Sequence, residues 1–516
     1  MEHDTYADAD LAEGGMRTVE VAGRKILLAR VGGTCHAIGA TCPHAGGPLG
    51  DGVLREGVVT CPWHKAAFRA ATGERVEPPA VDDVPRFPVR VGGGRILVTV
   101  TDKPGRVDAT PPTIDNDVRC MAILGAGAAG AVAAQTLREA GFTGRVVLIG
   151  REDRLPYDRT VLSKYTLSGQ KGGEKTPLQD AAFYTRHRIE RRVAEVTALD
   201  PAARTLTFAD GTHLAYDAAL IATGGVPRTL QIPGHDLPGV HLLRTAGDAE
   251  AIVGMAAYAR HVVVVGAGYI GLEAAGSLRE RGLEVAVVAP QDAPLERQLG
   301  PEVGSAFRRV HERQGVVFHL GQEVAAIEGN GRVQSVRLKS GVVLPADLVV
   351  AGLGIVPATG LLRGIACRKD QSLDVDAQLR VVDCLYAAGD IAAFPLYGHG
   401  DTIRVEHWRV AQQHGRVAAL NMLGQAMPYD AVPYFWTIHY RKRLDYVGHA
   451  ETWDEVVVDG NLEKPEFCAF YVQDNKVRAV AGWDRDRQMA AAIGLMSDRA
   501  DWSVAELRQA LGQPVI

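Results

Sequence analysis

Short apolar runs separated by glycine and proline turns fill the beginning of the chain. The runs RTVEVAG, KILLARV, GVVTC and RILVTV, all within residues 17–101, are typical of strands. The segment that follows, KPGRVDATPPTIDNDV at 103–118, has no apolar periodicity and predicts a linker between domains. We therefore expect residues 1–102 to form a small all-β domain.

A different pattern begins at residue 119, where an apolar strand, a glycine loop and a helix-like stretch follow one another. Residues 119–153 form one such unit, and residues 261–290 repeat it. Two copies of one strand–turn–helix unit predict two Rossmann-like α/β nucleotide-binding domains. The end of the chain is again rich in β-type runs and closes in helix-like sequence. The expected divisions are 119–241 with 375–428 for the first nucleotide-binding domain, 242–374 for the second, and 429–516 for a C-terminal α+β domain.

Composition and charge narrow the function classes. The 516 residues are 47% hydrophobic and 23% charged, with a formal net charge of −5, which argues against a nucleic-acid partner. The longest apolar stretches are interrupted by Asp, Gly and Pro, so no membrane span is expected. The acidic N-terminus does not resemble a secretory signal, and the seven irregularly spaced cysteines do not suggest a disulfide framework. We expect a cytoplasmic enzyme.

Two short Cys/His pairs are the first candidate metal ligands. Cys42 and His44 stand in one CPH motif, and Cys61 and His64 stand in a CPWH motif. A Rieske [2Fe–2S] cluster needs two thiolates on one iron and two imidazoles on the other, which these pairs supply. A structural zinc site uses the same residue types, and unliganded core cysteines are the plain alternative.

The two glycine loops are candidate dinucleotide sites. Gly125, Gly127 and Gly130 follow an apolar strand, and Glu152 lies 22 residues after Gly130, where a carboxylate binds a ribose hydroxyl.

The second loop places Gly266, Gly268 and Gly271 in the same arrangement. Its acidic position is missing, because the strand ends at Ala289, and Arg297 is a distant candidate for a 2′-phosphate. The second site thus takes NADH or NADPH, and we favour NADH.

The flanks of the Cys/His pairs resemble Rieske-type ferredoxins. The resemblance covers about residues 17–101 and is carried by CPHAGGPLGDG and by the W-H-x-x-x-F-x-x-x-T-G continuation from Trp63 to Gly73. It implies that Cys42, His44, Cys61 and His64 hold the cluster. No further cysteine accompanies the ligand pairs, so the resemblance is to the low-potential class, and Cys35 is expected in the core.

Residues 119 to about 516 resemble ferredoxin reductases of the glutathione-reductase fold. The whole chain resembles apoptosis-inducing-factor-like oxidoreductases with an N-terminal Rieske domain. The resemblance implies FAD at the first glycine loop and NAD(P)H at the second. It rests on PYDRTVLSK, AAGD, EHW and PYFWT. Besides the glycines and Glu152, the implied cofactor-binding residues are Arg159, Lys164, Thr223, Gly224, Tyr269, Ile270, Glu273, Asp390, Glu406, His407 and Trp408.

The same resemblance implies the catalytic residues Lys164, Glu273, Trp408 and Trp436. We predict that Lys164 and Glu273 form an ion pair beside flavin N5. The alternatives are a solvated surface lysine, an ordinary helix glutamate and two core tryptophans.

The sequence also lacks the cysteine pair of disulfide reductases, since no Cys-x4-Cys or Cys-x2-Cys follows either glycine loop. We therefore expect electrons to pass from NAD(P)H through FAD to the cluster, and then to an external oxygenase, cytochrome or ferredoxin-like protein. The histidine edge of the cluster is expected near the surface, and a homodimer is compatible with the sequence. The other hypotheses are an NADH-responsive redox sensor and a zinc module for partner binding.

Overall fold

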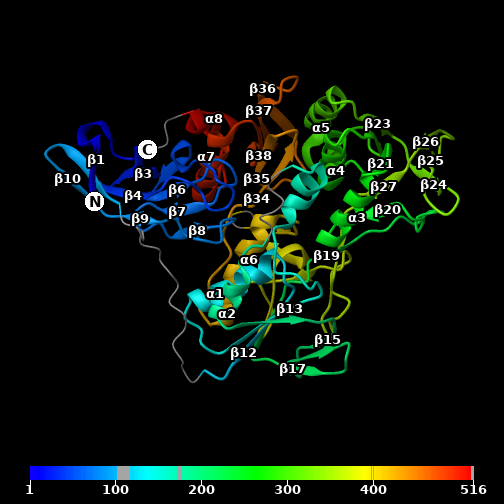
Figure 1. Cartoon of the computed structure of the whole chain (residues 1–516), viewed down its shortest axis with the longest axis horizontal. Coiled ribbons are helices and arrows are strands. Elements are labelled where there is room, and N and C mark those ends of the chain that lie inside the picture. Colours follow the sequence, from blue (N-terminus) through cyan, green and yellow to red (C-terminus); the bar gives the residue numbers. More distant parts are fainter. Residues whose placement is uncertain (101–116, 171–176, 397, 399, 513–516) are drawn as a thin grey trace.

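A computed structural model describes residues 1–100, 117–170, 177–396, 398 and 400–512. Most of the predicted linker, up to residue 116, lies outside the described residues. The N-terminal strands lie beside helices α7 (Asp486–Asp498) and α8 (Val504–Gly512) from the other end of the chain (Figure 1). The predicted fold class is confirmed: an all-β N-terminal part precedes two α/β parts and a C-terminal part with its own sheet.

The N-terminal part, residues 1–100, is built from antiparallel sheets in the strand orders β2-β3-β4-β9, β1-β11-β10 and β5-β6-β7-β8. Strand β3 packs on both faces: Leu27 and Ala29 belong to one apolar cluster, and Ile26 and Leu28 to another. This alternation is the normal consequence of the two-residue period of a strand. The strands are β1 (Glu2–Ala7), β2 (Met16–Val21), β3 (Arg24–Val31), β4 (Thr34–Gly39), β5 (Val53–Arg55), β6 (Val58–Thr60), β7 (Ala67–Arg69), β8 (Arg75–Glu77), β9 (Arg86–Phe87), β10 (Val89–Gly92) and β11 (Arg95–Thr99).

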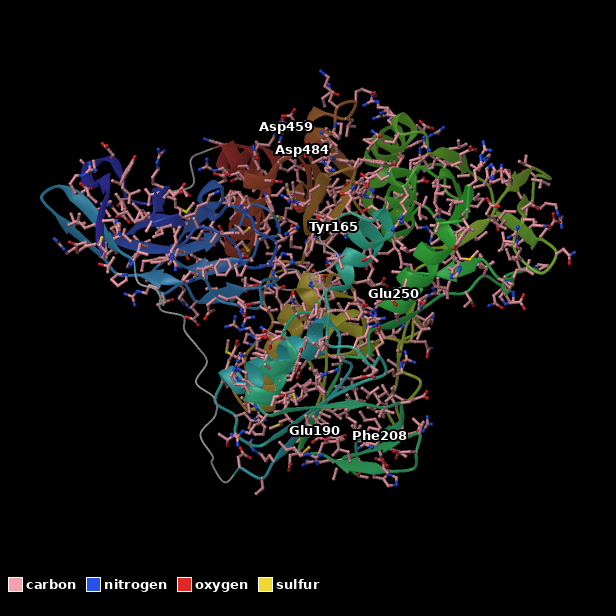
Figure 2. All side chains as sticks on the ribbon, in the orientation of Figure 1. Tyr165, Glu190, Phe208, Glu250, Asp459 and Asp484 are labelled. Atoms are coloured by element: carbon pink, nitrogen blue, oxygen red, sulfur yellow. The ribbon has the colours of Figure 1, made fainter. Side chains whose placement is uncertain are left out.

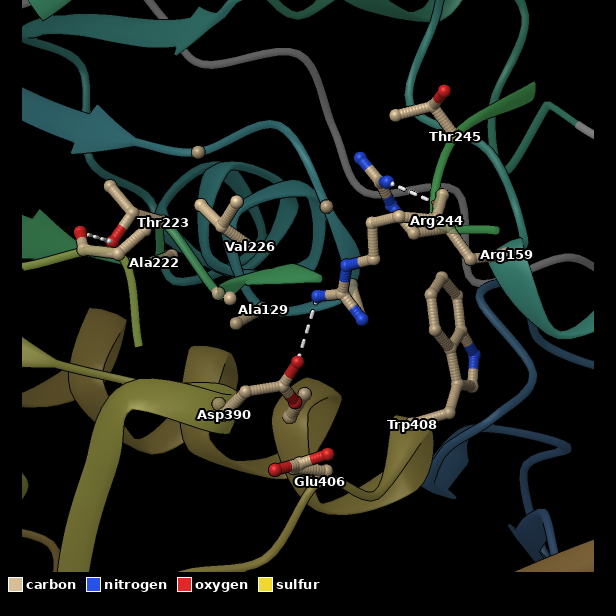
Figure 3. A pocket seen from close by; sticks show the side chains of 18 of the residues that line it. Ala129, Arg159, Ala222, Thr223, Val226, Arg244, Thr245, Asp390, Glu406 and Trp408 are labelled. Atoms are coloured by element: carbon tan, nitrogen blue, oxygen red, sulfur yellow. Dashed lines mark hydrogen bonds and ion pairs between the residues drawn. The ribbon is translucent and has the colours of Figure 1, made fainter. Parts of the chain in front are cut away.

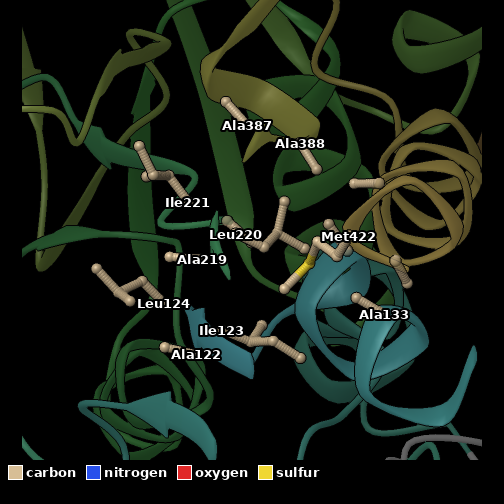
Figure 4. Packing of buried hydrophobic residues seen from close by; sticks show 14 of the residues in the cluster. Ala122, Ile123, Leu124, Ala133, Ala219, Leu220, Ile221, Ala387, Ala388 and Met422 are labelled. Atoms are coloured by element: carbon tan, nitrogen blue, oxygen red, sulfur yellow. The ribbon is translucent and has the colours of Figure 1, made fainter. Parts of the chain in front are cut away.

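The first α/β part is organised around the sheet β14-β13-β12-β18-β31-β30, in which all pairs except β30–β31 are parallel. Helices α1 and α6 lie very close together, since a Cβ at Gly415 would lie 2.1 Å from the carbonyl oxygen of Ala129. Ile123, Leu220 and Met422 fill the space between the sheet and these helices (Figure 4). The main elements are β12 (Cys120–Leu124), α1 (Ala128–Glu139), β13 (Arg145–Gly150), α2 (Ala181–Arg186), β14 (Ile189–Val193), β18 (Ala218–Ile221), β30 (Arg380–Val382), β31 (Leu385–Ala387) and α6 (Trp408–Met422).

The second α/β part repeats this plan with the parallel sheet β20-β27-β21-β22-β23. Small sheets and ribbons lie at the edges of both parts. The elements of the repeat are β20 (Val240–Leu242), α3 (Ala246–Ala256), β21 (His261–Val265), α4 (Tyr269–Glu280), β22 (Glu284–Ala289), α5 (Glu296–Arg313), β23 (Val317–Leu320) and β27 (Leu348–Ala351). The edge strands are β15 (Val196–Asp200), β16 (Thr205–Phe208), β17 (His213–Ala215), β19 (Gly225–Pro227), β24 (Val324–Glu328), β25 (Ser335–Leu338), β26 (Val343–Pro345), β28 (Ile355–Pro357), β29 (Leu373–Asp374), β32 (Ala392–Pro395) and β33 (Thr402–Ile403).

The C-terminal sheet is antiparallel in the order β34-β35-β38-β37-β36. Val53 of the N-terminal part shares one apolar cluster with Tyr434 and Trp436 of this sheet and with Met489 of α7, so the two ends of the chain share a core. Asp459 and Asp484 lie at the outer end of this sheet, and Glu190 and Phe208 at the opposite end of the molecule (Figure 2). The strands are β34 (Tyr434–His439), β35 (Lys442–Gly448), β36 (Glu455–Asn461), β37 (Glu466–Gln473) and β38 (Lys476–Trp483).

None of the helices in the described part of the chain is long and apolar enough to cross a membrane.

Candidate cofactor sites

Two loops of the N-terminal part, residues 42–47 and 61–65, bring the predicted metal ligands together; we call them the cluster loops. Both thiols are buried, and a hydrogen bond joins them. This bond lowers the pKa of Cys61 to about 6 and raises that of Cys42. Backbone N–H groups of the loops point at both sulfurs, as they do where thiolates carry an iron–sulfur cluster.

The imidazoles form a second pair. Nδ1 of His44 lies 3.1 Å from Nδ1 of His64, and the two rings stand nearly perpendicular. Burial holds the pKa of His64 well below its usual value, which keeps its imidazole in the neutral form that binds metal. The two δ nitrogens therefore point at one place.

The donor set fits a two-iron cluster. In the described residues, no group of three or more His, Cys, Asp or Glu side chains is arranged around one metal position. The donors come instead as a sulfur pair and a nitrogen pair, which is the Rieske arrangement. A Cβ at Gly47 would lie 2.7 Å from Sγ of Cys61, so only glycine lets that loop backbone lie so close to the sulfur. The paired donors and this close approach fit a Rieske cluster.

The expectation that the histidine edge lies near the surface is wrong. His64 is only 8% exposed, and its ring centroid is 4.7 Å from that of Trp436 in the C-terminal sheet. Nε2 of His44 lies 3.6 Å from Oδ2 of Asp158 in the first α/β part. Burial raises the pKa of Asp158, but His44 and Thr160 lower it more, so it stays below its usual value. The edge thus faces the α/β and C-terminal parts.

A cavity of about 1080 Å³ opens in front of the first glycine loop. A volume at the upper end of ligand pockets suits a dinucleotide. The predicted residues on its wall are Gly125, Gly127, Glu152, Arg159, Lys164, Thr223, Gly224, Tyr269, Ile270, Glu273, Asp390, Glu406, His407, Trp408 and Trp436. Gly130, Gly266, Gly268 and Gly271 do not line it.

The first glycine loop has the tight geometry that a pyrophosphate site needs. Gly125 has φ +113°, and a Cβ there would lie 2.0 Å from the Ala222 carbonyl oxygen. A Cβ at Gly130 would lie 1.8 Å from the Gly125 oxygen, whereas one at Gly127 would meet nothing within 4 Å. The outer glycines therefore pack the turn, and the middle one leaves the N-terminus of α1 open to an anion.

The second glycine loop repeats this geometry. Gly266 has φ +107°, a Cβ at Gly271 would lie 2.2 Å from the Gly266 oxygen, and Gly268 faces open space. Ala289, the last residue of β22, is buried, and Arg297, in the first turn of α5, is exposed.

Glu152 lies at the cavity wall with both carboxylate oxygens in use. Its Oε2 accepts a hydrogen bond of 2.7 Å from the Tyr157 hydroxyl, and its Oε1 accepts one of 2.7 Å from Nη2 of Arg159. Burial raises the pKa of Tyr157 to about 12, so the phenol remains a donor. Glu152 is therefore held in place before any ribose binds.

Arg244 extends across the cavity toward Asp390 (Figure 3). Its Nη2 donates to Oδ2 of Asp390 over 2.8 Å, and its own carbonyl accepts from Nη1 of Arg159. The motifs did not reveal Arg244, because it stands alone before the helix cap at Thr245 and belongs to no glycine loop. It is one of the functional candidates that sequence reasoning missed.

The EHW segment forms the start of α6 at the cavity wall. His407 is the N-cap residue, and burial lowers its pKa to about 3, so the ring is neutral. Burial likewise raises the pKa of Glu406. Within the described residues, buried Nε1 of Trp408 and Nδ1 of His407 have no hydrogen-bond partner. Orphaned polar atoms on the wall of a large cavity fit a bound ligand with acceptor groups.

The predicted ion pair between Lys164 and Glu273 is present, with Nζ 3.1 Å from Oε2. Both side chains are buried, so Lys164 is not a surface lysine. Lys164 lies in a π-helical turn, η4 (Leu162–Thr166), a conformation common at functional sites. Glu273 also accepts hydrogen bonds from Ser163 and from Oγ1 of Thr437, so it joins three elements at the cavity wall.

Trp408 and Trp436 contribute both to an apolar core and to the wall of the cavity. They pack in the apolar cluster of the C-terminal part, and both also line the cavity. Trp436 therefore has the cavity on one side and His64 of the cluster loops on the other.

Comparisons with known proteins agree with this architecture. Residues 120–415 match the family described as pyridine nucleotide-disulphide oxidoreductase, residues 2–88 match the Rieske [2Fe-2S] domain, and residues 434–511 match the reductase C-terminal domain.

Two curated relatives show how far the similarity extends. Apoptosis-inducing factor 3 of Mus musculus is 38% identical over 492 residues, covering 92% of this chain and 81% of the relative. Rhodocoxin reductase of Rhodococcus erythropolis is 36% identical over 380 residues, covering 73% of this chain and 89% of the relative. The first similarity therefore includes the Rieske part, whereas the second spans a length close to that of the reductase part alone.

Among solved structures, a ferredoxin reductase for the CYP199A2 system from Rhodopseudomonas palustris superposes with a TM-score of 0.71. It is 33% identical, with 77% of this chain and 98% of that chain covered. The covalent putidaredoxin reductase–putidaredoxin complex gives a TM-score of 0.71 at 29% identity, with 77% and 96% covered.

Proposed function

The chain belongs to the pyridine nucleotide-disulphide oxidoreductase family, as an FAD-dependent NAD(P)H oxidoreductase with a Rieske [2Fe–2S] domain, and on this premise we propose an internal electron route. Electrons from NAD(P)H reach the flavin cavity, cross to the cluster of the same chain, and leave to an external protein acceptor. In balance, NAD(P)H and two oxidised one-electron acceptors give NAD(P)⁺, one proton and two reduced acceptors. When bound, FAD accepts the hydride and releases its electrons singly to the cluster.

The position of Trp436 carries this proposal. Its side chain lines the cavity, and its ring lies 4.7 Å from the ring of the cluster ligand His64. His44 adds a second contact through Asp158, which precedes the cavity residue Arg159. The two imidazoles of the donor set thus contact residues of the reductase part, His64 through Trp436 at the cavity wall and His44 through Asp158, which supports transfer inside one molecule.

The wall residues have separable roles in this proposal. Arg159 orients Glu152 for the ribose, and Arg244 holds Asp390 for the ribityl chain. The N-terminus of α6 lies at the cavity wall, and its positive dipole would stabilise charge that develops on the flavin when the flavin is reduced. Lys164 and Glu273 would lie beside the flavin ring, where each buried charge holds the other in position.

We also propose functional divisions of the chain that follow the sequence limits. Residues 1–102 carry the cluster, 119–241 with 375–428 bind FAD, 242–374 bind NAD(P)H, and 429–516 complete the reductase. The external acceptor is of the oxygenase, cytochrome or ferredoxin-like class. Similar proteins are named as ferredoxin reductases of dioxygenase systems, such as the biphenyl dioxygenase component of Paraburkholderia xenovorans.

Anaerobic stopped-flow with NADH tests the order of transfer. We expect flavin bleaching first and reduction of the [2Fe–2S] chromophore afterwards in the same trace. Gly130→Val removes the first step, because even a Cβ at this position overlaps the Gly125 carbonyl oxygen. Cluster reduction by NADH in that FAD-free variant would refute the route. A cluster that stays oxidised in wild type after the flavin is fully reduced would also refute it. Slow turnover with a change of oligomeric state would favour the redox-sensor alternative.

A further inference from the structure

Lys65, which directly follows the cluster ligand His64, has an unusual conformation and location. Its backbone φ is +61°, in the left-handed region that favours glycine. Its side chain has 0% exposure, although lysine is almost never fully buried without a partner. A residue strained and buried at once persists where its surroundings require that residue.

The partner of Lys65 belongs to the other end of the chain. Nζ of Lys65 lies 2.7 Å from Oδ2 of Asp445 in β35, whose side chain is 1% exposed. The same ammonium donates to the carbonyl oxygen of Pro62 over 2.5 Å. One buried cation therefore holds the second cluster loop and reaches the C-terminal sheet.

The strand register links this pair to the electron route. Trp436 of β34 and Asp445 of β35 are direct cross-strand partners. His64 lies against Trp436, and the next residue, Lys65, pairs with Asp445. Two consecutive residues of the cluster loop thus meet two paired residues of the reductase, which leaves little freedom for the loop to slide.

Neighbouring groups strengthen this contact. Asp445 accepts a hydrogen bond of 2.7 Å from the Tyr434 hydroxyl and one of 3.1 Å from Nε of Arg443. Nη2 of Arg443 also donates to the Pro62 carbonyl over 3.1 Å. Lys65 and Asp445 are buried, and Arg443 is nearly so. Breaking the contact between the two parts would therefore leave the Lys65 ammonium without its partner carboxylate, which is strongly destabilising for a buried charge.

We propose that Lys65 and Asp445 are a positioning pair that fixes His64 against Trp436, so that the Rieske domain works in one docked place and does not swing. This inference rests on the proposed electron route. Neither residue touches a reacting atom, and both act through the position of the cluster loop.

The test uses the holoprotein with Lys65→Gly, Asp445→Asn and the double variant. Glycine suits the φ of position 65 and removes the charge. Lys442→Ala is the matched control, since Lys442 and Asp484 form a second lysine–aspartate pair with Lys442 on the same strand, at 2.9 Å but 48% and 41% exposed. Electron paramagnetic resonance of the reduced protein first verifies that the cluster is present in each variant.

Two readouts decide the inference. We expect the radius of gyration from small-angle scattering, and hydrogen exchange at residues 434–448, to rise in the Lys65 and Asp445 variants but not in the control. We also expect cluster reduction, measured against flavin bleaching in the same trace, to slow about tenfold or more. The double variant should match the single ones, because the two residues act as one unit.

Wild-type scattering and wild-type transfer rates in Lys65→Gly and Asp445→Asn would overturn the inference and leave the electron route intact. Absence of cluster reduction in the wild type would instead overturn the route, and with it the role of the pair. Additive losses in the double variant would also count against a shared function.

Discussion

The His44 imidazole and the Asp158 carboxylate meet across the boundary between the N-terminal part and the first α/β part, 3.6 Å apart. An anion beside a cluster ligand stabilises the oxidised, more positive form of the cluster. We expect Asp158→Asn to raise the reduction potential by on the order of 40 mV, equivalent to about 1 kcal/mol. Asparagine retains the helix cap that Asp158 provides to the Thr160 N–H.

A redox titration followed by electron paramagnetic resonance at one pH measures this shift. Asp153→Asn is the control, since Asp153 lies in the same segment but is exposed. An unchanged potential in Asp158→Asn would show that the carboxylate does not act on the cluster.

The buried pair of Lys164 and Glu273 predicts a separate effect on hydride transfer. Glu273→Gln keeps the shape of the side chain but removes the charge that pairs with Lys164 and accepts from Thr437. We expect the rate of flavin reduction by NADH to fall about a hundredfold or more, the usual loss when one preorganised polar group is removed. Glu280→Gln, at the exposed end of the same helix, should react like wild type in the same stopped-flow assay.

Trp436 predicts an effect on the second transfer only. Trp436→Leu removes the ring between the cavity and His64, so cluster reduction should slow about tenfold or more, which corresponds to about 1.4 kcal/mol of barrier. Trp436→Phe keeps an aromatic ring there and should retain more of the rate. Equal rates in the leucine and phenylalanine variants would mean that the ring has no role beyond filling space.

Buried histidines predict a loss of stability in mild acid. Burial lowers the pKa values of His407, His414 and His439 to about 3, below the ordinary value of 6.5. Because the unfolded chain binds these protons more tightly, the stability is complete above pH 6.5 and falls as the pH drops from there toward 3. Each histidine should lower the free energy of unfolding by about 1.4 kcal/mol per pH unit in that window.

His414 isolates one such contribution, because its Nδ1 accepts a hydrogen bond from the Gly389 N–H that a glutamine oxygen can also accept. We expect His414→Gln to lose less stability than wild type between pH 6.5 and 5.5, measured by urea unfolding with circular dichroism. The exposed His213→Gln should follow wild type. A variant as acid-sensitive as wild type would contradict the assignment.

The sequence predicted the local parts of the sites well. The glycine turns and the Cys/His loops are short segments in which neighbours along the chain determine the geometry, so their motifs carry the information. The Lys164–Glu273 pair joins distant residues, and it was predicted only through resemblance.

The motifs could not predict the contacts between the parts. Lys65 and Asp445 are 380 residues apart, and nothing local marks either as a partner of the other. Arg244 likewise depends on how its loop meets Asp390. The expected exposure of the histidine edge failed for the same reason, since burial of His64 is produced by a surface formed far away in the sequence.

The shared core between the two ends of the chain has a consequence for biosynthesis. Residues 1–100 leave the ribosome long before residues 434–448, which later cover the cluster loops, have been made. Until then the cluster loops lack the cover that this sheet provides. The C-terminal sheet, which is synthesised last, supplies the residues that bury His64 and Lys65.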